Sequence, residues 1–172
     1  MKQALRLGHR RVVLAIAGRK ETSPRYNREL AEAAQVAGRT AAELGLTVLT
    51  GGLSGVMERA AEGAKLAGGE TIGILPGQRH EDGNRFLDYV LPSGIGIARN
   101  CLLATACDFM LALPGGTGTL EEICFALDFE RPVLSWGSWE IEGVRKVEFP
   151  SEKKLKEAIR ALIEEKMSFK TI

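Results

Sequence analysis

Histidine is scarce in this 172-residue chain, which has only His9 and His80, far apart in the sequence. The three cysteines, Cys101, Cys107 and Cys124, lack the paired spacing of metal ligands. We therefore expect no histidine- or cysteine-based metal site and assign no metal ligand. The cysteines lie in apolar contexts, which predicts small buried residues in a reducing cytoplasm.

Net charge is also small, because 23 basic residues face 22 acidic ones and leave +1. Without a broad basic surface we expect no nucleic-acid polymer as a partner, whereas a small anionic ligand needs only a local positive potential. No apolar run approaches the ~20 residues of a membrane span, and residues 1–9 lack the pattern of a secretion signal. The 45% apolar content predicts a single globular domain over residues 1–172, with no membrane partner.

Apolar runs alternate with amphipathic segments along the chain. Buried strands are predicted at 11–17, 46–50, 70–75, 108–113 and 132–136, with shorter ones at 87–91 and 146–148. Helices are predicted over 24–44, 55–67, 93–106, 119–130 and 151–166, the first with Ser23 as N-cap and Pro24 at its first position. This alternation predicts an α/β fold, a Rossmann-like doubly wound parallel sheet with helices on both faces.

Two glycine-rich segments follow predicted strands and lead into predicted helices. A helix N-terminus presents free N–H groups and a partial positive charge, and glycine lets the backbone approach an anion closely. Neither segment is a Walker loop or a G-x-G-x-x-G motif, and a pair of tight turns is the alternative interpretation. We expect a phosphate at this edge, near Gly18 and Arg19 after the first strand; the segments supply Gly51, Gly52, Gly55, Pro114, Gly115, Gly116, Thr117, Gly118 and Thr119.

Two pairs of residues each permit two interpretations. Thr119 and Glu122 have the spacing of a capping box, but a carboxylate there would also lie beside a phosphate-linked sugar. Arg99 and Asn100 are expected at the solvent edge of their helix, or else the guanidinium points at an anion. Asp108 opens a strand and is predicted to be structural.

The stretch from Pro114 to Glu122 fits P-G-G-x-G-T-x-x-E, the signature of the LONELY GUY (LOG) family, once labelled "lysine decarboxylase-like". Residues 51–58 resemble that family's G-G-x-x-G-L-M-G motif, and the likeness runs from about 11 to 136. The resemblance implies a Rossmann-like fold, usually dimeric, that hydrolyses the N-glycosidic bond of nucleoside 5′-monophosphates. It assigns catalysis to Arg99 and Glu122, and phosphate binding to the glycines and Thr119. No pyridoxal-type lysine motif supports a decarboxylase.

The chain departs from the hydrolase pattern at Asn100, where the hydrolases usually carry lysine. Arg-Asn resembles a sister branch that includes molybdenum cofactor carriers, which bind a pterin phosphate. Residues 136–139 depart from the pattern as well. The resemblance therefore leads to a phosphoribohydrolase, with a non-catalytic carrier of molybdenum cofactor or a nucleotide-binding protein as the alternative. Either ligand would be a small phosphorylated molecule, and no other cofactor is required. A homodimer or higher homo-oligomer is expected, and the helices over 24–44 and 97–106 either form its interface or pack on the sheet.

Overall fold

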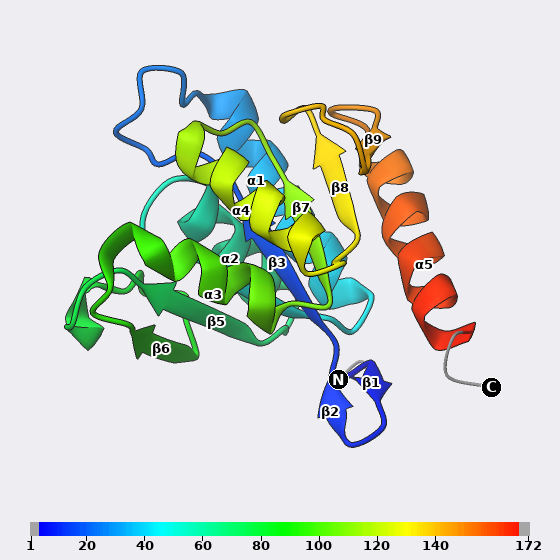
Figure 1. Cartoon of the computed structure of the whole chain (residues 1–172), viewed down its shortest axis with the longest axis horizontal. Helices are drawn as coiled ribbons and strands as arrows, with labels where there is room; N and C mark the ends of the chain where they lie inside the picture. Colours follow the sequence, from blue (N-terminus) through cyan, green and yellow to red (C-terminus); the bar gives the residue numbers. More distant parts are fainter. Residues whose placement is uncertain (1–3, 169–172) are drawn as a thin grey trace.

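The computed structural model describes residues 4–168 as one α/β domain (Figure 1). A sheet of seven parallel strands has the order β6-β5-β4-β3-β7-β8-β9. This confirms the predicted doubly wound fold. The strands are β3 (Val13–Ala17), β4 (Thr47–Thr50), β5 (Thr71–Leu75), β6 (Tyr89–Pro92), β7 (Phe109–Ala112), β8 (Val133–Trp136) and β9 (Val144–Val147), beside a separate antiparallel hairpin of β1 (Arg6–Leu7) and β2 (Arg10–Arg11).

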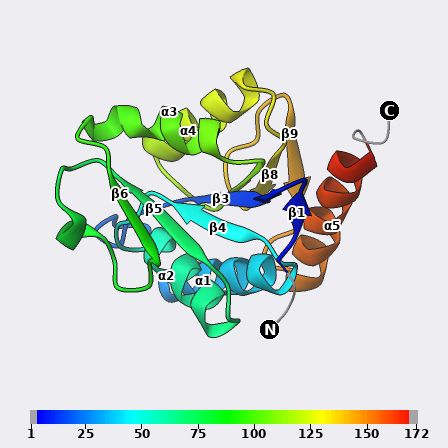
Figure 2. The ribbon, with the colours of Figure 1, turned by 90° about the horizontal axis from the view of Figure 1, so that it is seen from below.

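Helices cover both faces of the sheet (Figure 2). One layer contains α1 (Arg28–Glu43), α2 (Val56–Leu66) and α5 (Glu152–Ser168), and the other contains α3 (Arg99–Ala106) and α4 (Thr117–Asp128). Two short 3₁₀ turns, η1 (His80–Asp82) and η2 (Gly96–Ala98), lie in the connections.

The core is divided by the sheet, because successive side chains of a strand point to opposite faces. In β3, Leu14 and Ile16 pack with the layer of α1, α2 and α5, while Ala15 and Ala17 pack with the layer of α3 and α4. Both sets are buried, which is why the strand appears in the sequence as a continuous apolar run.

Small residues bring α1 and α2 into backbone contact. A Cβ on Gly38 would lie 1.8 Å from the carbonyl oxygen of Ala60, and a Cβ on Gly63 would lie 1.9 Å from that of Gln35. Neither position therefore accommodates a side chain. Several small residues of α1 pack in the core beside the sheet, whereas the glycine packs against the neighbouring helix.

The first helix begins later than predicted. Its N-cap is Asn27, whose side-chain oxygen accepts a hydrogen bond from the Leu30 N–H at 2.9 Å, so Ser23 and Pro24 do not open the helix. The Ser23 hydroxyl instead accepts a hydrogen bond from the Arg19 guanidinium at 3.0 Å. The prediction was wrong because the sequence offers two residues that can cap a helix, Ser23 and Asn27, four positions apart. The Ser23 hydroxyl binds Arg19, and Asn27 caps the helix.

The helix predicted over 93–106 is confined to its second half. Gly94 and Gly96 have φ of +70° and +60°, in the left-handed region that an α-helix excludes, so α3 starts only at Arg99. The expectation of three buried cysteines also needs correction. Cys107 is buried, and burial raises the pKa of its thiol to about 12, but Cys101 is only partly buried and Cys124 lies on the exposed side of α4.

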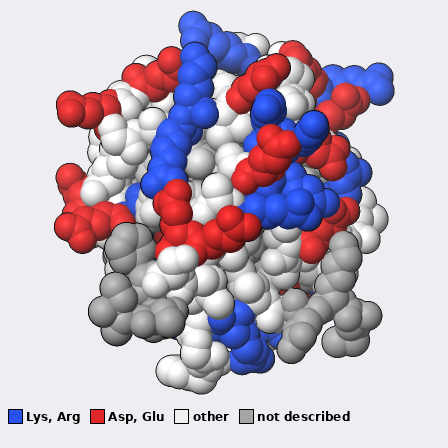
Figure 3. All heavy atoms as spheres, turned by 90° about the vertical axis from the view of Figure 1, so that its right-hand side faces the viewer, with Lys and Arg blue, Asp and Glu red and all other residues white. Residues whose placement is uncertain are grey.

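Charges of both signs interleave on the face formed by α5 and β9 (Figure 3). Ion pairs such as Arg145–Glu165 on this face account for the mixture. Within residues 4–168, no helix has the length and apolar character needed to cross a bilayer.

Asp108, immediately before β7, links three parts of the fold. Its carboxylate, 2% exposed, accepts two hydrogen bonds of 2.7 Å from Arg10 and one of 2.9 Å from the Val13 N–H. It also forms an ion pair of 2.7 Å with Lys166. The hairpin, β3 and α5 are thereby joined. Burial disfavours the charged form, but the hydrogen bonds from Arg10 and Lys166 outweigh it and hold the pKa of Asp108 well below its usual range.

We predict that Asp108→Asn lowers the free energy of unfolding by about 1.5–3 kcal/mol at pH 7, because hydrogen bonds to a charged group are lost. A depressed pKa stabilises the fold above the unfolded pKa of about 3.9, and this contribution is lost as pH falls towards the folded value. Urea unfolding at pH 7 and pH 3 should show the difference from wild type shrinking at pH 3. An unchanged difference would contradict this account.

Candidate functional site

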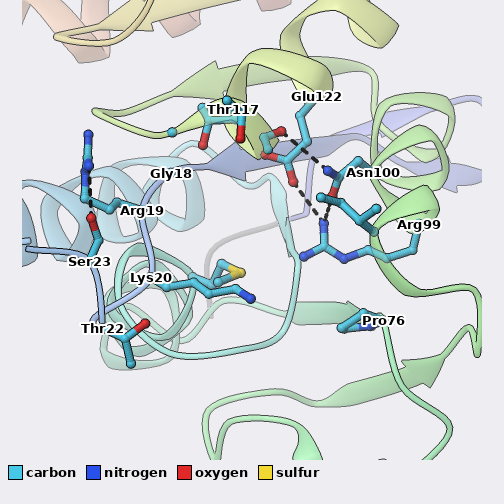
Figure 4. A pocket seen from close by; sticks show the side chains of 15 residues that line it. Gly18, Arg19, Lys20, Thr22, Ser23, Pro76, Arg99, Asn100, Thr117 and Glu122 are labelled. Atoms are coloured by element: carbon cyan, nitrogen blue, oxygen red, sulfur yellow. Dashed lines mark hydrogen bonds and ion pairs between the residues drawn. The ribbon is translucent and has the colours of Figure 1, made fainter.

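The ligand edge of the sheet lies where its winding direction reverses. The chain leaves β3 towards α1 on one face, and it leaves the adjacent β7 towards α4 on the other. Such a point opens a crevice beyond the carboxyl ends of the two strands. A cavity of about 400 Å³ lies there (Figure 4), lined by Gly18, Arg19, Lys20, Thr22, Ser23, Met57, Pro76, Ile97, Arg99, Asn100, Gly116, Thr117, Gly118, Thr119 and Glu122.

The N-terminus of α4 borders this cavity. The helix begins at Thr117, two residues before the predicted start, with Gly116 at the N-cap and no side chain capping it. The predicted capping box is therefore wrong: Thr119 lies inside the first turn, and Glu122 forms an ion pair with Arg99 instead. The N–H groups of Thr117, Gly118 and Thr119 have no acceptor within the helix, so they and the partial positive charge of the helix favour an anion.

Two glycines in the loop before α4, Gly115 and Gly116, lack a side chain for different physical reasons. A Cβ on Gly115 would lie 2.1 Å from the Thr119 hydroxyl, so packing within the loop excludes a side chain there. A Cβ on Gly116 would meet nothing within 4 Å, although the residue borders the cavity. Internal packing therefore does not explain Gly116, and the missing side chain leaves room for a ligand to approach the backbone closely.

Two cations enter the cavity from the loop after β3. Arg19 donates to the carbonyl oxygen of Gly115 at 2.9 Å, which joins this loop to the one before α4. Lys20 extends along one side of the cavity towards the guanidinium of Arg99 (Figure 4). Within residues 4–168, neither Arg19 nor Lys20 forms an ion pair with a carboxylate. Their positive charge is thus available to an anionic ligand.

Arg99 and Asn100 are buried rather than solvent-exposed, which corrects the first of the two interpretations for this pair. The guanidinium of Arg99 donates through Nη1 to Oε1 of Glu122 at 3.0 Å and to Oδ1 of Asn100. Its other terminal nitrogen lies against Gly51, where a Cβ would approach it to 2.3 Å. The glycine after β4 therefore makes room for the arginine head.

Asn100 connects Arg99 to the first turns of α4. Its Oδ1 accepts from Arg99, and its Nδ2 donates to Oε2 of Glu121 at 3.0 Å. A lysine at this position has donors only and cannot accept from a guanidinium. The asparagine thus holds Arg99 between two acceptors, Asn100 and Glu122, in a way that the Arg-Lys pattern cannot reproduce.

Glu122 is the only carboxylate lining the cavity as the structure describes it, and its side chain is 8% exposed. Burial raises the pKa of Glu122 to about 7, because it disfavours the charged form more than the nearby Arg99 favours it. The carboxyl group therefore changes its protonation state near neutral pH, as a general acid or base requires.

The cavity brings together eight of the residues selected from the sequence: Gly18, Arg19, Arg99, Gly116, Thr117, Gly118, Thr119 and Glu122. Gly51, Gly52, Gly55, Pro114 and Gly115 support it from behind and do not line it. The sequence placed Lys20 beside Arg19 at the predicted ligand edge without selecting it, and Met57 lies within the glycine motif of residues 51–58; Pro76 and Ile97 were not selected. Among the described residues, no group of three His, Cys, Asp or Glu side chains is arranged to hold a metal ion.

This chain is similar to solved structures of molybdenum cofactor proteins and to one uncharacterized relative. The molybdenum cofactor binding protein of Rippkaea orientalis is 29% identical, with a TM-score of 0.80 over 90% of this chain and 99% of that one. The molybdenum cofactor carrier protein of Chlamydomonas reinhardtii is 28% identical, with a TM-score of 0.81 over the same shares. An uncharacterized protein of Archaeoglobus fulgidus is 39% identical over 116 residues, which are 67% of this chain and 76% of that protein.

The model of the SLOG cluster4 family matches residues 11–167, which is nearly the whole fold. The match includes the loops after β3 and β7 and the pair Arg99–Glu122. The comparison agrees with the LOG-like resemblance at the level of fold and superfamily, and it does not single out the LOG enzymes. The chain belongs to the SLOG cluster4 family.

Proposed function

We propose that this protein binds the phosphorylated pterin of molybdenum cofactor and acts as a carrier rather than as a hydrolase. One observation carries the proposal: the cavity is lined by an uncapped helix N-terminus and by Arg19 and Lys20, which have no carboxylate partner among residues 4–168, in a fold that matches cofactor carriers over 99% of their length. The hydrolase, which the sequence favoured first, becomes the second candidate.

The cavity has the chemistry that a phosphorylated ring system needs. The free N–H groups at the start of α4 would hold the phosphate, with Arg19 and Lys20 supplying positive charge. Met57, Pro76 and Ile97 provide apolar lining. Apolar walls with a few placed polar groups are typical of sites for small ligands.

Asn100 favours binding over catalysis. Because it accepts a hydrogen bond from Nη1 of Arg99 while Glu122 accepts another, this nitrogen of the guanidinium is engaged by the protein before any ligand arrives. A hydrolase needs its charged groups directed at the bond that breaks. In this chain the arrangement instead fixes the wall of the cavity, as suits a carrier that releases its ligand unchanged.

Hydrolysis of a nucleoside monophosphate keeps one observation in its favour. Arg99 and Glu122, the residues that the LOG resemblance marks as catalytic, meet in the cavity at 3.0 Å. As the base leaves, its bond to the sugar breaks and positive charge develops on the sugar, which an ionised Glu122 would stabilise while water attacks.

The carrier proposal predicts that freshly purified protein contains molybdenum cofactor. Oxidation of the denatured protein should release a fluorescent pterin, and metal analysis should find molybdenum in proportion. We expect Arg19→Ala to reduce the pterin content at least about tenfold, because a charged contact to phosphate is lost. Arg160→Ala, a charge-matched change on the exposed side of α5, should leave the content unchanged. Equal pterin content in the two variants would contradict the proposal.

The hydrolase candidate predicts base release from a panel of nucleoside monophosphates, followed by chromatography. The rate should rise as pH increases through about 7, because Glu122 must be ionised to stabilise the developing charge. Glu122→Gln should reduce release at least about a hundredfold at pH 8 with the melting temperature retained. Absence of release by folded wild type across the panel would exclude hydrolysis of those substrates.

The homodimer expected from the sequence stays a prediction, as does the cytoplasmic location. Of the two helices considered for an interface, α1 packs within the fold, whereas the segment leading into α3 and α3 itself expose Ile97 and Leu102. We therefore favour the surface around α3. Light scattering should show a dimer for wild type and a monomer for Leu102→Glu; a dimer in both would exclude this surface.

A further inference from the structure

Trp139 contacts the loop that precedes α4 from a distant part of the chain. It lies in the connection between β8 and β9, and its indole N–H donates to the carbonyl oxygen of Gly116 at 3.2 Å. The same oxygen accepts the first hydrogen bond of α4, from the Leu120 N–H at 3.1 Å. The carbonyl at the N-cap is therefore held by two donors, one inside the helix and one outside it.

This contact sets the direction of an N–H group that faces the cavity. In a trans peptide the carbonyl and the N–H of the following residue point in opposite directions. Fixing the oxygen of Gly116 towards the helix and Trp139 therefore directs the Thr117 N–H away from both, out of the N-terminus. No atom lies within 4 Å of the place where a Cβ of Gly116 would stand, so side-chain packing does not help to fix this residue.

The other tryptophan shows what a purely structural role looks like. Trp136 is fully buried, stacks edge-to-face on Phe149 with ring centroids 5.1 Å apart, and donates to the Glu148 carbonyl. Trp139 is 39% exposed and directs its polar atom at the ligand edge of the sheet. Exposing a large apolar ring is unfavourable in itself, so burial alone does not account for this position.

We propose that Trp139 is a positioning residue for phosphate recognition: its hydrogen bond to Gly116 holds the N–H groups at the start of α4 in the orientation that a phosphate monoester requires. Trp139 does not touch the phosphate; it acts through the peptide between Gly116 and Thr117. The inference rests on the proposed function, because it needs a phosphate at this helix N-terminus. It adds a residue that the P-G-G-x-G-T-x-x-E motif does not contain.

Inorganic phosphate is the probe, and calorimetric titration of the full chain measures its affinity. We expect Trp139→Phe, which keeps a ring but removes the donor, to bind phosphate about two- to tenfold more weakly, the effect of one net hydrogen bond. Phe129→Leu is the matched control, since Phe129 is also 39% exposed but lies at the opposite end of α4. It should bind as wild type does, and all three proteins should share a melting temperature.

Nuclear magnetic resonance supplies a readout that a merely structural role would not move. The chain has two tryptophans and so two indole N–H resonances; Trp139→Phe identifies them. On addition of phosphate the Trp139 resonance should shift saturably, with the Trp136 resonance unchanged. Equal phosphate affinity in wild type and Trp139→Phe overturns this inference alone. Failure of wild type to bind phosphate overturns both the inference and the proposed function on which it rests.

Discussion

The arrangement of β3 beside β7 is the constraint on which the rest of the molecule depends. Both strands are buried on both faces, so each must be followed by a helix that covers one of those faces. The helix after β3 covers one face and the helix after β7 covers the other. Because the two helices begin on opposite faces, a cavity remains between their N-terminal ends, and backbone N–H groups line its edge. The anion-binding role that we propose for the site follows from this topology.

Side chains then adapt this common crevice to one kind of ligand. Positive charge comes from the loop after β3 and from α3. Among the described residues Glu122 is the one carboxylate that lines the cavity; Arg99 holds it, and burial raises its pKa to about 7. Asn100 completes the network by accepting from Arg99 and donating to Glu121. Arg99, Asn100 and Glu122 are buried, and their hydrogen bonds fix one face of the cavity wall, while Nε of Arg99 has no partner among the described residues.

Family membership and the local chemistry point to the same order of candidate functions. The SLOG cluster4 match and the likeness to cofactor carriers extend over nearly the whole fold, which makes a phosphorylated pterin the ligand that we favour. The pair Arg99–Glu122 is what a hydrolase would also need, but in this chain an asparagine engages the arginine. The two candidate functions thus differ in what the guanidinium of Arg99 contacts. The proposed phosphate position at the N-terminus of α4 is the same for both.

The sequence by itself determined the strands, the alternation with helices and the glycine-rich loops, because these depend on local periodicity and backbone freedom. It also selected Arg99 and Glu122 as candidates. Tertiary structure alone decided what they do: Thr119 and Glu122 matched a capping box, and Arg99 matched a solvent edge, until the packing of α3 against α4 brought the arginine to the carboxylate. The contact of Trp139 with Gly116 likewise joins segments 23 residues apart. Such choices depend on which distant groups become neighbours, and local spacing does not encode them.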